Sequence, residues 1–316
     1  MKEIISVLGK ISPKEVGFCQ CHEHILLSKG KSFALNPALC IDDIKKSICE
    51  LIRYKEAGGS TIIDAQPIGC NRMTEELAHV STSSNVNIIS STGFHKLSFY
   101  SNTHWIHNIN VQTLGTIFTR ELTEGMFINT DTHFPDMQCT SRAGIIKTAL
   151  DTEGLTPRYQ TLFNAAILAA LDTHQPIMIH VEQNTNPIPL LDFLLNKGLP
   201  GNQLIFCHLD RACKNFDIHR KIASSGAYIE YDTIGRFKYH SDYQEILLIK
   251  QLISNGYENQ LLLSLDTTSE RLKSYSEHAI GLDYIIKKFI PLMSAQHITK
   301  DQINLFTVHN AVRALT

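Results

Sequence analysis

Eight short apolar segments recur along this 316-residue chain, and stretches with helical spacing separate them. Several of these segments are apolar at almost every position, which is typical of strands that are covered on both faces. Strands that alternate with helices predict a parallel sheet, and eight such units predict a (β/α)8 barrel. The expected strands are residues 17–24, 61–66, 86–92, 144–150, 176–181, 203–208, 227–232 and 260–266.

The helical stretches favour the same fold. Residues 42–57 place apolar side chains at helical spacing and stop at Gly58 and Gly59, which suit a helix terminus. No linker or internal repeat interrupts the chain, so residues 1–316 are predicted to form a single barrel domain. Further helices are expected at residues 157–173, 242–254 and 278–289, and two more within the polar segment 96–140.

Composition limits the possible function classes. A net charge of −2 argues against a general binder of nucleic acid or membrane surfaces, and no apolar stretch approaches the length of a membrane span. The apolar run at residues 4–8 is too short for the core of a signal peptide, and eight cysteines in so long a chain do not suggest a disulfide scaffold. We therefore expect a cytoplasmic protein with reduced cysteines that acts on a small molecule.

Polar residues terminate or interrupt several of the expected strands. His22 and His24 are two positions apart, so on a strand their imidazoles point to the same face. Barrel active sites form where the carboxyl ends of the strands meet, and the fold would bring these side chains together there. Taken singly, each has an ordinary explanation. Asp266 could cap a helix, and Lys147 could extend its ammonium group to the solvent from a buried position. The full set is His22, His24, Lys147, His180, His208 and Asp266.

Several motifs, in chain order, carry a resemblance to a known family. They are LGKISPKEVGFCQCHEHILL, GIIKTA, PIMIHVE, LIFCHLD, LSLD and the closing INLFTVHNAVRAL. Together they resemble the phosphotriesterase family of the amidohydrolase superfamily, which consists of barrels with two metal ions, and the resemblance covers almost the whole chain. Two departures are Cys21, where relatives often carry proline, and the sequence HLDR after the sixth strand, which bears on the substrate class.

The resemblance implies a role for each of the six residues. Lys147 would bridge two cations as an N6-carboxylysine, because an ammonium group has no acceptor for a metal whereas a carbamate offers two oxygens. Burial near cations favours the neutral amine that must react with carbon dioxide. Nitrogen and carboxylate ligands suit zinc, with manganese, cobalt or iron as alternatives. The other implied ligands are His22, His24 and Asp266 for a buried metal, and His180 and His208 for a more exposed one.

Such a centre predicts metal-assisted hydrolysis. Two cations lower the pKa of a bridging water so that hydroxide can attack, and the more exposed cation polarises a carbonyl or phosphoryl oxygen. Asp266 would take the proton and pass it to the leaving group. A non-catalytic metal-binding protein is a further alternative, which the complete set of six ligand positions disfavours.

Cationic and phenolic side chains on the barrel-end loops indicate the kind of substrate. Arginine and lysine bind phosphate well, whereas a neutral organophosphate triester or a long acyl-homoserine lactone would require an apolar pocket. Taken singly, each of these side chains is equally well explained as a solvated surface residue. The expected substrate-binding residues are His95 at the end of the third strand and the loop residues Arg211, Arg236, Lys238, Tyr239, Arg271, Lys273 and Tyr275.

The same loops resemble a branch of the family that hydrolyses phosphorylated sugar lactones. The leading prediction is therefore hydrolysis of a phosphorylated sugar γ-lactone, with the phosphate as a remote group whose binding positions the ring carbonyl. The alternative is a lactonase or esterase for neutral lactones, such as acyl-homoserine lactones, with promiscuous phosphotriesterase activity. Relatives are often dimers, so the resemblance also suggests a homodimer.

Overall fold

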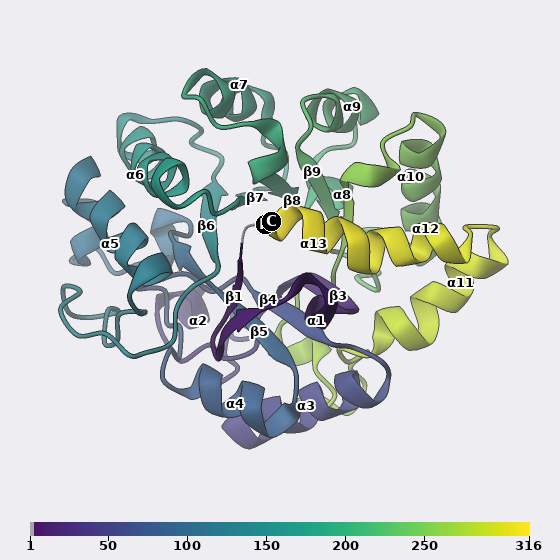
Figure 1. Ribbon diagram of the computed structural model, residues 1–316, viewed down its shortest axis with the longest axis horizontal. Helices are drawn as coiled ribbons and strands as arrows, with labels where there is room; N and C mark the ends of the chain where they lie inside the picture. Colours follow the sequence, from purple (N-terminus) through teal and green to yellow (C-terminus); the bar gives the residue numbers. More distant parts are fainter. Residues whose placement is uncertain (1–2) are drawn as a thin grey trace.

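Eight parallel strands, β3 to β10, form a barrel at the centre of the molecule (Figure 1). The computed structural model describes residues 3–316. Each barrel strand overlaps one of the eight expected segments, so the predicted (β/α)8 barrel is confirmed. The strands are β3 Cys19–Glu23, β4 Thr61–Asp64, β5 Asn87–Gly93, β6 Ile145–Leu150, β7 Ile177–Val181, β8 Leu204–Cys207, β9 Tyr228–Tyr231 and β10 Leu261–Leu263.

The barrel closes between β3 and the segment that follows β10. The strands pair in chain order from β3 to β10, and individual hydrogen bonds bridge the remaining seam. The Asp266 N–H donates to the His22 carbonyl (3.1 Å), and the Ser264 hydroxyl donates to the same carbonyl (2.8 Å). The Glu23 carboxylate accepts from the Thr267 N–H (3.1 Å). These bonds fix the residues after β10 against the end of β3.

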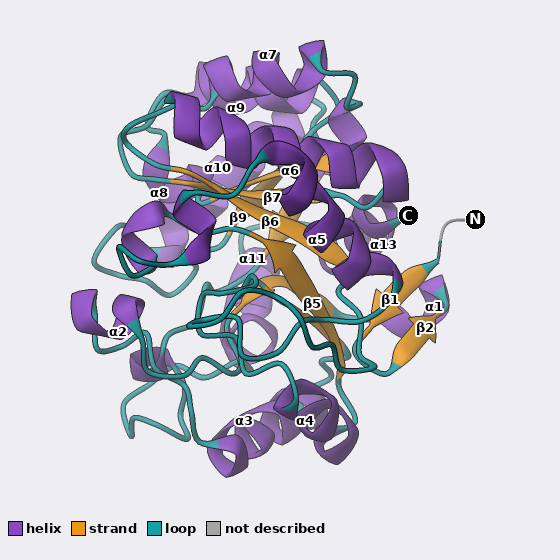
Figure 2. Cartoon of the chain, turned by 90° about the vertical axis from the view of Figure 1, so that its left-hand side faces the viewer, coloured by secondary structure: helices purple, strands orange, loops and turns teal. Residues whose placement is uncertain are grey.

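An outer layer of helices covers the strands, and capping side chains set where several helices begin (Figure 2). The Asp43 carboxylate accepts from the Lys46 N–H (3.0 Å) ahead of α3. Ser241 and Gln244 form a reciprocal capping box ahead of α10. The longer helices are α3 Ile44–Glu56, α4 Glu76–Ser84, α5 Val111–Thr123, α6 Pro157–Thr173, α7 Ile188–Asn196, α9 Phe216–Ser224 and α10 Asp242–Ser254. The shorter helices are α1 Pro13–Val16, α2 Lys31–Leu35, α8 Leu209–Ala212, α11 Ile290–Ala295, α12 Lys300–Asn304 and α13 Asn310–Leu315.

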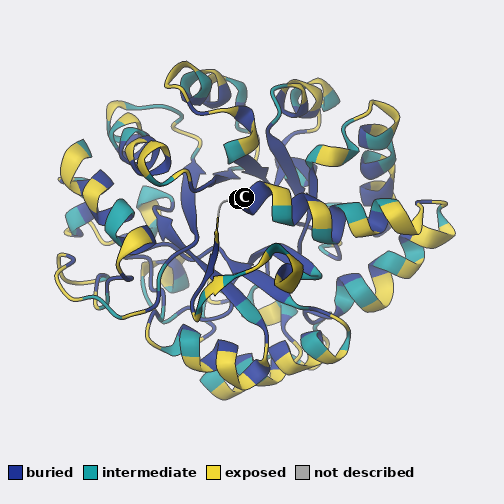
Figure 3. Ribbon diagram, in the orientation of Figure 1, coloured by how far each residue is buried: buried dark blue, intermediate teal, exposed yellow. Residues whose placement is uncertain are grey.

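The strands bury apolar side chains on both faces, as their continuous apolar character predicts. Ile146 and Ile179 belong to the large cluster between strands and helices, whereas Ile145 and Met178 belong to the smaller cluster inside the barrel. Burial follows the strands and the inward sides of the helices, while the outward sides of the helices are exposed (Figure 3). The barrel interior is therefore a packed core below the site at its mouth.

The first and last elements of the described chain close the floor of the barrel. The hairpin of β1 Ile4–Ser6 and β2 Gly9–Ile11 precedes the first barrel strand. Ile4 lies in the same buried cluster as Leu315 of α13. The hairpin and α13 lie on one side of the molecule, and α2 lies on the opposite side (Figure 2).

Two helix predictions are wrong in detail. Segment 96–140 contains one α-helix, α5, together with the short 3-10 turns η1 Leu97–Phe99 and η2 Trp105–His107, instead of two helices. The helix expected at residues 278–289 begins only with the π-helical segment η6 Ile285–Phe289. Gly281 has a φ of +77°, and this left-handed conformation is incompatible with a helix that runs through it.

The cysteines agree with the expectation of reduced thiols. All eight are free, and Cys19, Cys21, Cys70, Cys207 and Cys213 are buried. Across residues 3–316, no helix combines the length and the apolar character needed to cross a membrane.

Candidate metal centre and active site

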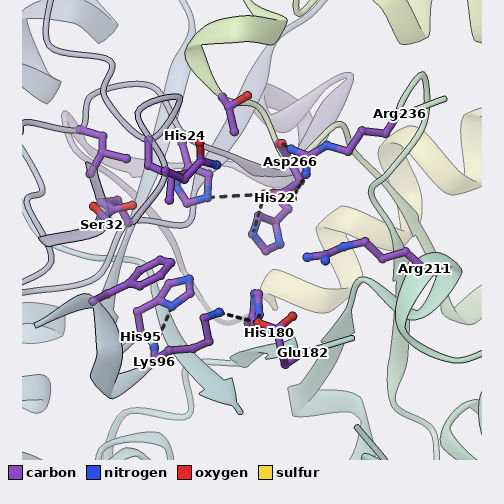
Figure 4. Close-up of a pocket in the computed structure, with 16 residues that line it drawn as sticks. His22, His24, Ser32, His95, Lys96, His180, Glu182, Arg211, Arg236 and Asp266 are labelled. Atoms are coloured by element: carbon purple, nitrogen blue, oxygen red, sulfur yellow. Dashed lines mark hydrogen bonds and ion pairs between the residues drawn. The ribbon is translucent and has the colours of Figure 1, made fainter. Parts of the chain in front are cut away.

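The six predicted metal ligands meet at the mouth of the barrel, and Figure 4 labels four of them, His22, His24, His180 and Asp266. Each comes from the carboxyl-terminal part of a strand or from the residues just after it, and all six are buried. They are His22 on β3, His24 after β3, Lys147 on β6, His180 on β7, His208 after β8 and Asp266 after β10.

The first group of ligands is His22, His24 and Asp266 at the barrel seam. Asp266 Oδ1 lies 3.6 Å from His24 Nε2 and 3.9 Å from His22 Nε2. One ligand atom from each residue lies within 4.8 Å of the other two. Imidazole nitrogen and carboxylate oxygen are common ligands of zinc and related divalent ions, so these three residues can hold one cation.

The second group is His180 and His208, whose rings face each other. His208 Nδ1 lies 2.7 Å from Asp232 Oδ1, and His180 Nε2 lies 3.3 Å from Glu182 Oε2, so each ring donates its proton to a carboxylate. Burial lowers the pKa of His208 well below its usual value and that of His180 to about 4, so both rings are neutral near pH 7. The remaining nitrogens, His208 Nε2 and His180 Nδ1, are 2.8 Å apart and both carry lone pairs. This arrangement fits a cation that both nitrogens contact.

Lys147 is fully buried and has no acidic partner. Its Nζ atom lies 2.9 Å from His22 Nε2 and 3.7 Å from Met178 Sδ. Within the part of the chain that the structure describes, no carboxylate lies within ion-pair distance of Lys147 Nζ. An ammonium buried without a counter-charge is unfavourable, whereas a carbamate beside two cations would be compensated. The surroundings therefore fit a carboxylated lysine.

Irregular backbone directs two of these ligands into the barrel. His208 and Asp266 have φ values of +63° and +50°, so neither continues the alternation of the strand before it. Cys207 faces the barrel interior together with His208, and its Sγ atom lies within 4.8 Å of a His22 ring nitrogen. Two adjacent residues can both face the interior here because the strand does not continue through His208.

Asp266 is ionised within the site. Burial alone would raise the pKa of Asp266, but the Arg236 guanidinium and the neighbouring histidines hold it well below its usual value. Arg236 Nη1 lies 3.3 Å from Asp266 Oδ2. Asp266 is thus a carboxylate near neutral pH and is able to accept a proton.

Sequence reasoning missed the carboxylates that lie behind the histidines. Glu230 on β9 and Asp232 just after it interrupt the apolar sequence AYIEYD, and this interruption is the signal that could have identified them. Glu182 lies in the quoted motif PIMIHVE without an assigned role. Burial raises the pKa of Glu230 to about 8, and a cation held by His22 would lower it again, because nearby positive charge favours the carboxylate.

A cavity of about 200 Å³ opens above the ligands (Figure 4). Three of the predicted substrate-binding residues, His95, Arg211 and Arg236, line it. The Lys96–Glu182 ion pair (2.5 Å) contributes to the wall beside His180. The rest of the lining is mixed, with Ser32, Asn36, Gln66 and Thr268 among its polar members and Leu27, Leu39 and Phe99 among its apolar ones.

A second cavity of about 240 Å³, the cationic hollow, adjoins the first. Arg236, Lys238 and Arg271 line the cationic hollow, and Arg236 also lines the cavity above the ligands. Arg271 Nη2 donates to the Ile234 carbonyl (2.7 Å), which holds the loop after β9 in place. Glu270 is the acidic residue of the lining, so the hollow has an excess of positive charge.

The other predicted substrate-binding residues lie outside these two cavities. Tyr239 packs its ring 5.4 Å from the Arg211 guanidinium and lines a separate hollow. Lys273 pairs with Asp283 (2.5 Å), and the Tyr275 hydroxyl hydrogen-bonds the main chain immediately before α3 (3.0 Å). The loop after β10 folds back toward α3 at these positions. The predicted substrate-binding residues therefore do not form one group, and Lys273 and Tyr275 do not line the two cavities at the predicted ligands.

An eight-stranded barrel whose mouth gathers neutral imidazoles, a buried lysine and an ionised carboxylate defines the class of metal-dependent barrel hydrolases. Residues 2–315 match the sequence model of the Phosphotriesterase family. The chain belongs to that family, which confirms the resemblance seen in its motifs, and it is a hydrolase.

Individual relatives are similar to the chain over almost its whole length. A phospho-furanose lactonase from Mycoplasmopsis synoviae is 25% identical over 98% of this chain and 90% of its own length. An N-acetyltaurine hydrolase from Danio rerio is 25% identical over 99% of this chain and 98% of its own length. The crystal structure of a lactonase from Listeria monocytogenes has a TM-score of 0.89 and 26% identity, and the match covers 100% of this chain and 99% of that one.

Proposed function

We propose that this hydrolase opens a phosphorylated sugar γ-lactone to give the phosphorylated aldonic acid. The observation that carries the proposal is the cationic hollow beside the ligand cluster, with Arg236 lining both cavities. The similarity to a phospho-furanose lactonase and to a second lactonase supports the same chemistry. An ester carbonyl would lie above the ligands while the anionic group occupies the hollow.

The proposed centre would hold two divalent cations, with zinc as the preferred ion. Lys147, as an N6-carboxylysine, would be one of the residues that hold them. Bound cations of this kind supply an activated water nucleophile and polarise the ester carbonyl. The residues that would hold them are His22, His24 and Asp266 for the inner position, and His180 and His208 for the outer position.

Asp266 moves the proton in this scheme. Its carboxylate is ionised, and Oδ1 faces the ligand histidines while Oδ2 faces Arg236. It can therefore accept the proton released by the attacking water and donate it to the ring oxygen that leaves. Arg236 keeps Asp266 ionised before that transfer and orients it by the contact to Oδ2.

The cationic hollow would hold the phosphate. Lys238 Nζ lies 5.0 Å from the centre of the Tyr239 ring, and Lys238 also lines the hollow that Tyr239 lines. It makes no ion pair within residues 3–316, so its ammonium group is available to an anion. Guanidinium and ammonium groups form charge-assisted hydrogen bonds to phosphate that are about twice as strong as neutral ones. Binding energy from this remote group would orient the lactone carbonyl over the ligands.

The alternative of a neutral lactone with a long acyl chain, combined with phosphotriesterase activity, fits the cavity less well. A long apolar chain requires an apolar wall, whereas Lys96, Glu182, Arg211 and Arg236 line this cavity. The N-acetyltaurine hydrolase relative makes an amide substrate a second candidate at the same identity, so the substrate panel must include N-acetyltaurine.

The experiment is a substrate panel on protein of known metal content. It compares phosphorylated pentono- and hexonolactones, the same lactones without phosphate, an acyl-homoserine lactone, a phosphotriester and N-acetyltaurine. We expect kcat/KM to be highest for a phosphorylated lactone. A higher value for any of the other substrates would contradict the proposal and would identify the alternative in its place.

Lys238→Met tests the phosphate site directly. Loss of a hydrogen bond between charged groups costs about 1.5–3 kcal/mol, so kcat/KM for the phosphorylated lactone should fall about 10–100-fold. The value for the unphosphorylated lactone should change little. Lys273→Met is the matched comparison, because Lys273 contacts Asp283 outside the cationic hollow. Equal losses on both lactones in Lys238→Met would count against the phosphate site.

A further inference from the structure

Glu230 is an acidic residue inside the barrel. It lies on β9, is 0% exposed, and has His22, Cys207 and Asp232 as close neighbours. Burial of a carboxyl group in such a place is costly unless the group makes a specific interaction. The roles proposed above for the metal ligands and Asp266 do not account for Glu230.

The interaction that Glu230 makes is with His22. Glu230 Oε2 lies 3.2 Å from His22 Nδ1, while Glu230 Oε1 has no hydrogen-bond partner among residues 3–316. The His22 ring has a second nitrogen, Nε2, which lies 2.9 Å from Lys147 Nζ and 3.9 Å from Asp266 Oδ1. Glu230 therefore contacts the side of the His22 ring that faces away from the other ligands.

Asp232 is the other acid near the same nitrogen, but it is already engaged. Its Oδ2 lies 3.6 Å from His22 Nδ1, which is beyond hydrogen-bond distance. Both Asp232 oxygens accept from His208, one from Nδ1 (2.7 Å) and the other from the main-chain N–H (3.0 Å). Glu230 is thus the acceptor that remains for His22.

We infer that Glu230 is a positioning residue for the inner cation. It accepts the Nδ1–H of His22, and this fixes the tautomer in which Nε2 carries the lone pair. It also holds the ring so that Nε2 is directed toward Lys147 and Asp266. The inference rests on the metal centre in the proposed function. Carboxylates that orient ligand histidines in this way typically contribute 10–100-fold to metal affinity or activity.

The test measures cation binding, separately from activity. Metal-free protein of the full chain is titrated with zinc in competition with a chromophoric chelator, for the wild type, Glu230→Gln and Glu230→Met. Methionine removes the acceptor at similar volume and should weaken one of the two binding steps about 10–100-fold. Glutamine keeps an acceptor oxygen without the charge, so its affinity should lie between those of methionine and the wild type.

Glu245→Gln is the matched control. Glu245 on α10 is also 0% exposed, and its Oε2 atom lies 3.0 Å from His240 Nε2, much as Glu230 lies against His22. It is not among the residues around His22. The same chemical change there should leave both zinc affinities unchanged. A loss in Glu245→Gln equal to that in Glu230→Gln would assign the effect to general disturbance of the core and would overturn the inference.

Two further outcomes separate the possible failures. If the wild type does not bind two zinc ions, the proposed metal centre itself fails. If the wild type binds two and a folded Glu230→Met binds both with unchanged affinity, the centre stands and the role of Glu230 is refuted. Should Glu230→Met not fold, Glu230→Gln decides, and unchanged affinity for both ions in that variant refutes the role equally.

Discussion

Lys147 shows most directly how surroundings decide the chemistry of one residue. It is fully buried beside His22 and Met178 and lacks an acidic partner within the described residues. We expect Lys147→Glu to retain two cations, because a carboxylate supplies two oxygens without carbon dioxide. Lys147→Met should lose at least one cation and nearly all turnover. Metal content per chain and kcat on the preferred lactone check both outcomes.

Retention of both cations and of activity in Lys147→Met would refute a carboxylated lysine. A folded Lys147→Met that keeps two cations and full activity would show that no bridging ligand is needed at this position. The mass of the intact wild-type protein under native conditions adds an independent test, because carboxylation adds the mass of one carbon dioxide.

That these six side chains meet at the barrel mouth could be predicted from the sequence, because a polar residue stands out at the end of an apolar strand. The acidic residues that contact these side chains, Asp232 and Glu230, were harder to identify from the sequence. Asp232 contacts His208 only because His208 turns into the barrel with a φ of +63°, and no propensity rule assigns that conformation to histidine. Lys273 is a residue whose charge suggested a role that the structure does not give it. It was expected to contact substrate, but the path of its loop directs it to Asp283.

At the scale of elements, the junction between β5 and β6 positions Lys147. Gly93 ends β5 with a φ of +100°, and a Cβ atom placed there would lie 1.9 Å from the Lys147 carbonyl oxygen. Gly93→Ala therefore requires the two strands to separate. We expect a loss of unfolding free energy of about 2–4 kcal/mol and weaker cation binding, measured by denaturant titration and by zinc competition.

Gly154→Ala is the control for backbone strain alone. Gly154 has a φ of +66°, and nothing would lie within 4 Å of an added Cβ atom. Its substitution should cost only about 1–2 kcal/mol for the left-handed conformation and leave zinc affinity unchanged. If the two variants behave alike, the close approach of Gly93 to Lys147 is not what holds the ligand in place.

Elements with strong local signals were predicted well. The helices at residues 157–173 and 242–254 were placed correctly, because Pro157 begins the first and a Ser241–Gln244 capping box begins the second. The helix expected at 278–289 failed where Gly281 leaves helical geometry. Strand ends were placed one to three residues too late at β8 and β10, because the final residues curve into the mouth as ligands.

At the scale of the whole molecule, bound cations should stabilise the fold. His22, His24, Lys147, His180, His208 and Asp266 come from five strands or strand ends, so cations that bind them link distant parts of the chain. Binding to the folded state alone adds about 2.7 kcal/mol at a free concentration one hundred times the Kd. We expect a strong chelator to lower Tm by several degrees and zinc to restore it, as measured by calorimetry. A Tm that is insensitive to both treatments would argue that the cluster binds no cation.

The β1–β2 hairpin and α13 close the floor of the barrel, and the cavity opens at the other end. A purification tag, a fusion partner or a covalent tether attached at either end of the described chain would therefore emerge behind the catalyst. Molecules immobilised on a bead by such an attachment would keep the barrel mouth open to the surrounding solution. The bead would then not obstruct diffusion of reactant and product to and from the cavity.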